Sequence, residues 1–247
     1  PGDVSAAAQP ARALVWVDRK GQETPIAAPQ RRYAIPRISP DGTRVAIDVR
    51  DQTNDIWIWD FNRQTLSALS RDPAVDMSPI WRPDGKRVIW TSTRGGGNPN
   101  LYWQAADGTG AAERLSTNMT NQFPTSISPD GGTVVLFGAS GNIMSAMDLF
   151  TLNLKEAPRR GIPLVSATGL DFGGEVSPDG RWLAYHSSES GEAQVYVRPF
   201  PNVNDGRWQI SNAGGTRAAW SRNGRELFYL DRDGRVCSVS VTPGASF

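Results

Sequence analysis

Short apolar runs recur along this chain, and each follows a turn of the same composition. The turns read Ser-Pro-Asp-Gly at 39–42, 128–131 and 177–180, and Arg-Pro-Asp-Gly at 82–85. A fifth, altered copy at 221–224 reads Ser-Arg-Asn-Gly. Proline presets φ for a type I turn, Asp or Asn tolerates the next position, and glycine takes the positive φ that leads into a second strand. Each copy therefore predicts a hairpin of two strands, a and b.

The runs after the turns are rich in β-branched and aromatic residues, which favour strands. They lie at 45–47, 88–90, 134–137, 183–185 and 227–229. A third run follows a polar loop at 56–59, 101–103, 149–152 and 195–197, and a weaker fourth follows, as at 65–69. The turn glycines recur every 43–49 residues. Four antiparallel strands in a repeat of this length are typical of one blade of a β-propeller.

The ends of the chain hold incomplete repeats. Residues 14–21 and 22–27 have the pattern of strands c and d, whereas 216–241 has that of a, b and c, which gives 21 strands in all. We therefore expect one all-β propeller domain over 14–247, preceded by a linker or edge segment at 1–13. The repeats are expected around 14–30, 31–73, 74–119, 120–168, 169–213 and 214–247.

Composition narrows the possible functions. Nine Trp, eight Phe and five Tyr supply large side chains for packing between blades. A net charge of +1 gives no long-range field for nucleic acid, and one cysteine excludes an intrachain disulfide and a thiolate-rich metal site. No run of about 18 apolar residues is present, so we expect no insertion into a membrane.

The repeats resemble a known family. The Pro-Asp-Gly hairpins, the stretch Asp-Ile-Trp-Ile-Trp-Asp at 55–60 and Val-Tyr-Val-Arg-Pro-Phe-Pro at 195–201 are similar to TolB-type propeller repeats of bacteria. More narrowly, they resemble the propeller fused to some bacterial serine/threonine kinases. The resemblance implies a six-bladed type with incomplete terminal blades, an extracytoplasmic or periplasmic location and a larger parent protein. The alternative is five blades closed by pairing of the chain ends.

Few residues are suited to catalysis. His186 is the one histidine, so a nucleophilic triad depends on it and a multi-histidine metal site is excluded. No glycine-rich phosphate loop or kinase catalytic loop is present. We expect no enzyme activity and no cofactor, although a structural calcium ion held by oxygen ligands stays open.

Candidate binding residues follow from the blade geometry, because strand a is innermost in a propeller. Counting back from each turn proline gives mixed polar positions, which we expect at the channel mouth on the face opposite the turns. These residues are either free for a ligand or simply hydrate the channel. The candidates are Tyr33, Arg37, Asp76, Gln122, Asp171, Glu175 and Arg217.

We expect a non-catalytic propeller that binds a protein, a peptide or a small ligand, as the sensor or scaffold domain of a bacterial envelope or signalling protein. A carbohydrate-active enzyme using Asp76, Asp171 and Glu175 is the alternative, and a structural spacer is a third interpretation. The open blade edges also predict self-association of the chain.

Overall fold

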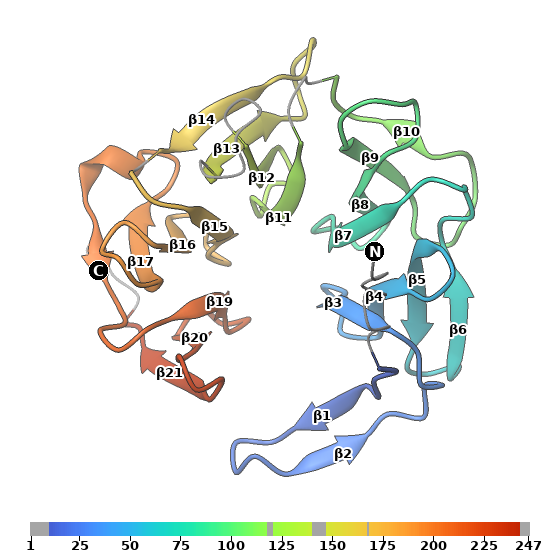
Figure 1. The fold of residues 1–247 in the computed structure, drawn as a ribbon, viewed down its shortest axis with the longest axis horizontal. Coiled ribbons are helices and arrows are strands. Elements are labelled where there is room, and N and C mark those ends of the chain that lie inside the picture. Colours follow the sequence, from blue (N-terminus) through green and yellow to red (C-terminus); the bar gives the residue numbers. More distant parts are fainter. Residues whose placement is uncertain (1–9, 118–120, 140–146, 167, 243–247) are drawn as a thin grey trace, which may run out of the picture.

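The strands form sheets arranged around a central axis (Figure 1). The structure is a computed structural model and describes residues 10–117, 121–139, 147–166 and 168–242. Four sheets have four strands, one has three, and a separate ribbon has two. Every pairing is antiparallel between strands that follow one another in the chain, as blades require.

The ribbon and the first two blades come from the N-terminal half of the chain. The ribbon consists of β1 (Val15–Val17) and β2 (Glu23–Pro25). Blade 1 consists of β3 (Tyr33–Ile38), β4 (Arg44–Arg50), β5 (Asn54–Asp60) and β6 (Thr65–Ala68). Blade 2 consists of β7 (Asp76–Trp81), β8 (Arg87–Ser92), β9 (Asn100–Ala105) and β10 (Glu113–Arg114).

The remaining blades follow in the same order. Blade 3 consists of β11 (Phe123–Ile127), β12 (Thr133–Ala139), β13 (Met147–Asn153) and β14 (Gly161–Val165). Blade 4 consists of β15 (Asp171–Val176), β16 (Trp182–Ser187), β17 (Gln194–Pro199) and β18 (Trp208–Gln209). Blade 5 consists of β19 (Thr216–Trp220), β20 (Glu226–Leu230) and β21 (Val236–Ser240).

This arrangement confirms the all-β propeller and the 21 strands, divided as the sequence pattern predicts. A single 3₁₀ turn at Val203–Asp205 is the only helical element within the described ranges. No helix of bilayer length and apolarity occurs among those residues.

The five turns lie together on one rim. Each turn glycine has a positive φ, between 65° and 77°: Gly42, Gly85, Gly131, Gly180 and Gly224. A Cβ placed on the last four would be 3.3–3.9 Å from Cδ of the proline in the preceding turn. Each turn therefore packs on its neighbour around the ring, which confirms the predicted turn chemistry and its single rim.

The core lies between blades. One buried cluster joins Ile56 and Ile58 of blade 1 to Trp81 and Trp90 of blade 2, and equivalent clusters join each later pair. Trp90 has no exposed surface. Burial of these large side chains between neighbouring blades is the main stabilising contribution. Trp90 therefore confirms the prediction that aromatic residues pack in the core.

Each innermost strand is interrupted by a β-bulge, which the sequence pattern did not predict. The pairing register shifts in the same part of β3, β7, β11, β15 and β19. In four blades the residue five before the turn proline, or before Arg222, has a positive φ: Ile35, Ser78, Gly173 and Arg217. Bulges bend a strand and redirect its side chains. The two halves of each innermost strand therefore place their side chains at opposite ends of the channel.

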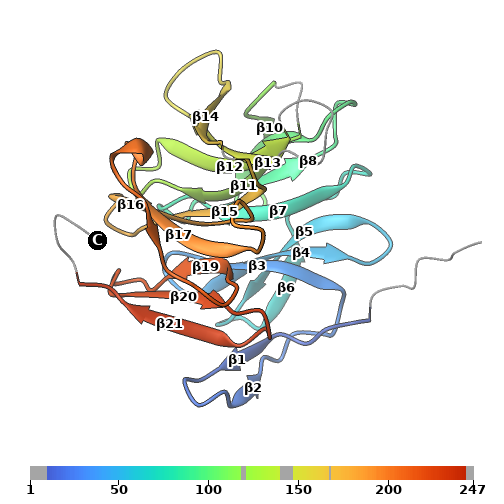
Figure 2. The ribbon, with the colours of Figure 1, turned by 60° about the vertical axis from the view of Figure 1, so that its left-hand side comes forward.

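The ribbon occupies the break in the ring. It lies beside the end of blade 5, as Figures 1 and 2 both show, and the Arg19 guanidinium forms an ion pair of 2.6 Å with Glu226. The observed five blades match the stated alternative. Among the described residues, however, β1 pairs with β2 and β21 with β20, so side chains and not a strand ladder join the two ends.

Candidate functional site

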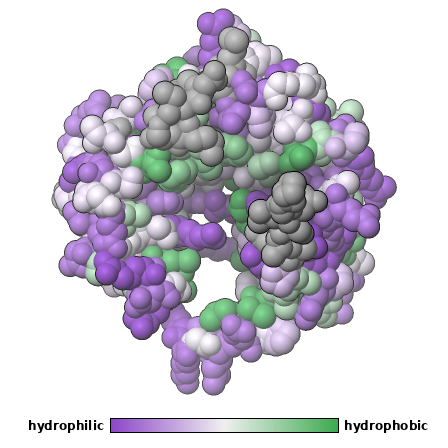
Figure 3. Space-filling model, viewed as in Figure 1, coloured by the Kyte–Doolittle hydropathy of each residue, from purple (hydrophilic) through white to green (hydrophobic). Residues whose placement is uncertain are grey.

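A cavity of about 620 Å³ opens at the turn-bearing end of the channel, which we call the turn-side mouth. Every blade contributes to it through the last residues of its innermost strand and its turn. The lining includes the four turn prolines, Pro40, Pro83, Pro129 and Pro178. The central opening of the ring is also visible in the space-filling view of Figure 3.

Apolar side chains form the wall of the turn-side mouth. Ile38 is 46% exposed although it lies in a strand, and Ile127, Val176 and Trp220 are half-buried. These residues occupy the position two before the turn proline in blades 1, 3 and 4, and two before Arg222 in blade 5. Exposed apolar side chains gathered in a concave surface are typical of a binding site for another apolar group.

An ion pair lies in the same cavity. Arg37 Nη1 of blade 1 donates to Glu175 Oε1 of blade 4 at 2.6 Å, and the side chains are 33% and 17% exposed. Burial raises the pKa of the Glu175 carboxyl, and the charge and hydrogen bond of Arg37 oppose that rise. The pair links non-neighbouring blades, so it places a cation and an anion together within the mouth.

Two tryptophans fix the backbone beneath this ion pair. Trp81 Nε1 donates to the carbonyl of Arg37 at 2.7 Å, and Trp220 Nε1 donates to the carbonyl of Glu175 at 3.0 Å. Each tryptophan belongs to the blade that follows the residue it holds. The two charged residues are therefore positioned by contacts between blades.

Arg222 takes the place of the turn proline in blade 5. Its Nη2 donates to the carbonyl of Ser39 in blade 1 at 3.3 Å. Its guanidinium also lies against Gly42, since a Cβ there would be 3.0 Å from both terminal nitrogens. Arg222 therefore completes the ring of turns across the break and adds a second cation to the mouth.

Four predicted site residues lie at, or one residue before, the start of the innermost strands, at the other end of the channel. Tyr33, Asp76, Gln122 and Asp171 are all buried. The Tyr33 hydroxyl donates to the carbonyl of Pro29 at 2.5 Å, and Gln122 Oε1 accepts a hydrogen bond from Ser116. In this conformation these side chains face the protein interior.

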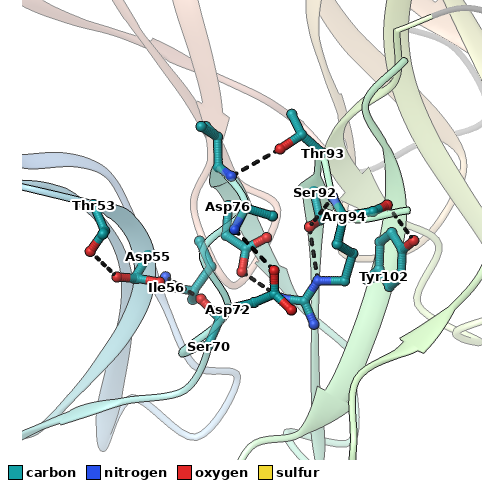
Figure 4. A network of polar contacts seen from close by, with 12 residues as sticks. Thr53, Asp55, Ile56, Ser70, Asp72, Asp76, Ser92, Thr93, Arg94 and Tyr102 are labelled. Carbon is teal, nitrogen blue, oxygen red and sulfur yellow. Dashed lines mark hydrogen bonds and ion pairs between the residues drawn. The ribbon is translucent and has the colours of Figure 1, made fainter. Parts of the chain in front are cut away.

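Asp76 belongs to a polar network between strands (Figure 4). Arg94 Nη2 donates to Asp76 Oδ2 at 2.6 Å, and Arg94 Nε donates to Ser92 Oγ at 2.9 Å. The same guanidinium lies over the Tyr102 ring, 5.2 Å from its centroid. The charge of Asp76 is thus matched inside the fold, which accounts for an acid at this position.

Arg217 is exposed and lies near His186, whose pKa is lowered to about 4 by burial and, to a smaller extent, by the Arg217 charge. His186 ends a row of rings that also contains Phe172, Phe137 and Phe123, with neighbouring centroids 5.0–5.6 Å apart. The row joins blades 3 and 4. The histidine is therefore neutral at pH 7 and serves as an aromatic packing group.

These positions correct the prediction that all seven candidate binding residues lie at the channel mouth opposite the turns. Arg37 and Glu175 lie with the turn prolines. Strand a runs from one end of the channel to the other, so a residue three positions before the turn proline lies near the turn end of the channel. Sequence reasoning missed the prolines and Arg222 as cavity residues. The replacement of proline by arginine in the fifth repeat was the available signal for Arg222.

Comparisons with known proteins agree with this architecture. The model of the family described as the TolB beta propeller domain matches residues 12–155, more than half of the chain. The chain belongs to this family. The Tol-Pal system protein TolB of Helicobacter pylori strain J99 is 24% identical over 175 residues, which cover 70% of this chain and 41% of that protein. The chain thus spans less than half the length of the curated relative it matches.

Solved structures share the TolB-type fold. A putative TolB from Agrobacterium tumefaciens has a TM-score of 0.74 at 17% identity, covering 91% of this chain and 86% of that one. An oligogalacturonate lyase in complex with manganese has a TM-score of 0.56 at 12% identity, covering 94% and 85%. At these identities the likeness shows the fold alone, and the fold hosts binding proteins and enzymes alike.

Within the described ranges, no group of three or more His, Cys, Asp or Glu side chains is placed to hold a metal ion. The three acids proposed for a carbohydrate-active enzyme, Asp76, Asp171 and Glu175, also lie in different environments. Asp76 and Asp171 are fully buried, whereas Glu175 is paired with Arg37 in the turn-side mouth. In this conformation the three acids do not line one open cleft.

Proposed function

We propose that this TolB-type propeller is a non-catalytic interaction domain that binds a protein segment in its turn-side mouth. The observation that carries the proposal is the proline-lined cavity of about 620 Å³ with Ile38, Val176 and Trp220 on its wall. Rigid proline and tryptophan surfaces lose little conformational entropy when they are covered, so they suit the binding of a peptide.

The size and rigidity of the mouth support a peptide as the bound element. The cavity has the volume of a small-ligand pocket and accommodates a few residues. Its wall is set by inter-blade contacts, including the two tryptophan hydrogen bonds, and is therefore organised before a partner arrives. An exposed segment or chain terminus of a partner protein fits such a surface.

We further propose that the domain is the sensor or scaffold part of a larger bacterial envelope or signalling protein, such as a receptor-type serine/threonine kinase. The support is the resemblance of its repeats to kinase-fused propellers. An antibody against the domain tests this idea on cells of the source organism. A band of the domain's own mass, 26.9 kDa, would contradict a larger parent.

Peptide selection tests the interaction function. Random dodecapeptides displayed on phage are selected on the domain, and the selected peptides are measured against Ile38→Glu. The control is Ile162→Glu on the outer strand β14, where the isoleucine is 57% exposed and outside the mouth. We expect Ile38→Glu to weaken binding at least about tenfold, since it places a charge against apolar ligand surface, and the control to preserve it.

The proposal fails if selection yields no binding peptide, or if the two variants weaken binding equally. A carbohydrate activity would overturn it in a different way. Glycan turnover by the domain that is abolished in Asp171→Asn would make the enzyme interpretation the correct one.

A further inference from the structure

We propose that the turn-side mouth selects peptides that carry a carboxylate beside apolar side chains, with Arg222 and Arg37 as the cationic groups. This inference rests on the proposed function, because it specifies the chemistry of the segment bound in the same mouth. It is carried by the balance of charge in the cavity and by the hydrogen-bonding capacity left on the two arginines.

The ionisable residues that line the cavity are two arginines and one glutamate: Arg37, Arg222 and Glu175. The mouth therefore has one more positive than negative charge, although the whole chain has a net charge of only +1. Apolar and proline walls surround these charges. A low-dielectric wall strengthens the attraction between such a site and an anionic group.

Arg37 has donor capacity left after its pairing with Glu175. Its Nη1 makes the one contact to the carboxylate, through a single oxygen. Its Nε is buried, and its Nη2 makes no hydrogen bond to the residues that the structure describes, so Nη2 is the donor that a ligand could reach. A guanidinium carries five N–H donors and prefers two-point contact with a carboxylate, so the arrangement leaves Arg37 able to bind a second acceptor.

Arg222 provides the second cation at the rim of the mouth. The other four repeats have proline at this position, which offers no donor. Arg222 is exposed, and its hydrogen bond to the Ser39 carbonyl is long at 3.3 Å. Since a carboxylate is a stronger acceptor than a neutral carbonyl, a ligand anion at the rim would attract this guanidinium.

The apolar wall defines the rest of the ligand. Ile38, Val176 and Trp220 lie in the same cavity as the arginines and have surface left to bury. A free chain terminus with apolar residues, or an acidic residue among apolar ones, presents both features. A purely acidic peptide leaves the wall uncovered, and a purely apolar one leaves the cations unpaired.

The test uses two synthetic libraries of pentapeptides built from Leu, Ile, Val, Phe and Pro. One library ends in a free carboxylate and the other in an amide, so the two differ only in their C-terminal group. Each is passed over the immobilised domain, and the retained peptides are measured by mass spectrometry. We expect at least about tenfold greater retention of the carboxylate library, the effect of one charge-assisted hydrogen bond.

Three variants locate the effect. Arg222→Pro restores the residue type of the other repeats and should reduce the preference for the carboxylate. Glu175→Gln removes the anion and should increase it. Arg232→Gln is the control, because Arg232 pairs with Glu192 on the exposed outer surface and is not part of the cavity lining.

The outcomes separate this inference from the proposed function. Equal retention of both libraries would overturn the carboxylate inference and leave peptide binding in the mouth intact. Retention of neither library would overturn both. A preference that persists in Arg222→Pro and is unchanged in Glu175→Gln would show that the carboxylate binds elsewhere, which contradicts the inference.

Discussion

Arg222 lies against Gly42, so the fifth turn of the chain meets the first. Both terminal nitrogens of the guanidinium are 3.0 Å from the position of a Cβ on that glycine. At the other four junctions a proline fills the equivalent place. The long arginine side chain spans a wider interval, because β19 and β3 are farther apart than other neighbouring innermost strands in Figure 1. The ring of turns is therefore closed, although the ring of blades has a break between blades 5 and 1.

The turn glycines are predicted to contribute to stability through their backbone conformation. Gly85 has φ of 65°, and a Cβ there would meet nothing closer than 3.9 Å. Gly85→Ala should therefore cost roughly 1 kcal/mol or more in the free energy of unfolding, from backbone strain and not from a clash. Denaturant titration measures this cost. Gly85→Asn should cost less, since asparagine tolerates the left-handed region better than alanine; an equal or larger loss would contradict the explanation.

His186 predicts a specific dependence of stability on pH. Its pKa is about 4 in the folded chain against 6.5 for a free histidine, because burial disfavours the charged ring. The unfolded state therefore binds more protons between these values, and stability should fall as pH drops from about 6.5 toward 4. The expected loss at pH 5 is about 2 kcal/mol.

A proton NMR titration of this single histidine measures the pKa directly. His186→Phe should remove most of the loss of stability while keeping the ring contact with Phe172. Arg217→Gln should move the pKa of His186 upward, since the Arg217 charge helps to lower it. A pKa of 6 or above for His186 in the folded protein would contradict the buried neutral ring.

The tryptophan contacts between blades are predicted to stabilise the mouth. Trp81→Phe removes the donor to the Arg37 carbonyl and should lower the free energy of unfolding by roughly 1–2 kcal/mol. Trp16→Phe is the matched control, because Trp16 is 46% exposed. Thermal unfolding of both variants measures the difference. Similar small effects of the two substitutions would show that the hydrogen bond contributes little.

The ends of the ring are predicted to favour self-association. β21 has no charged residue and no proline within Val236–Ser240, and Val236 is 70% exposed. The outermost strands of blades 2, 3 and 4 differ from β21, because β10 and β18 have two residues each and β14 contains a proline. Unprotected edges recruit other strands. Light scattering should therefore show concentration-dependent association, which Val236→Lys reduces; a monomer at all concentrations would contradict this prediction.

The repeats could be predicted from the sequence because each hairpin is specified by residues that are close together in the chain. Proline, aspartate and glycine at 83–85 fix the turn, and the apolar run after it fixes the strand, so four blades and two incomplete ends were accessible. The bulges were not, because Ile35 and Ser78 have no sequence feature that favours a positive φ. Their conformation is imposed by packing between blades.

The candidate site could be predicted only in part, because it too depends on packing between blades. The positions of Arg37 and Glu175 along their strands were visible in the repeats, but their 2.6 Å contact joins blades 1 and 4 and depends on the closure of the whole ring. The burial of Asp171 likewise follows from tertiary packing. Sequence distance to a turn identifies a layer of the propeller, whereas partners across the channel require the fold.

A crystal structure of the domain with a peptide selected from the random library is the most direct test of the interaction function. We predict that the peptide lies in the turn-side mouth and covers Ile38, Val176 and Trp220. A peptide bound instead in the cavity between blades 1 and 2, which Arg44, Asp60 and Asp107 line, would contradict the account.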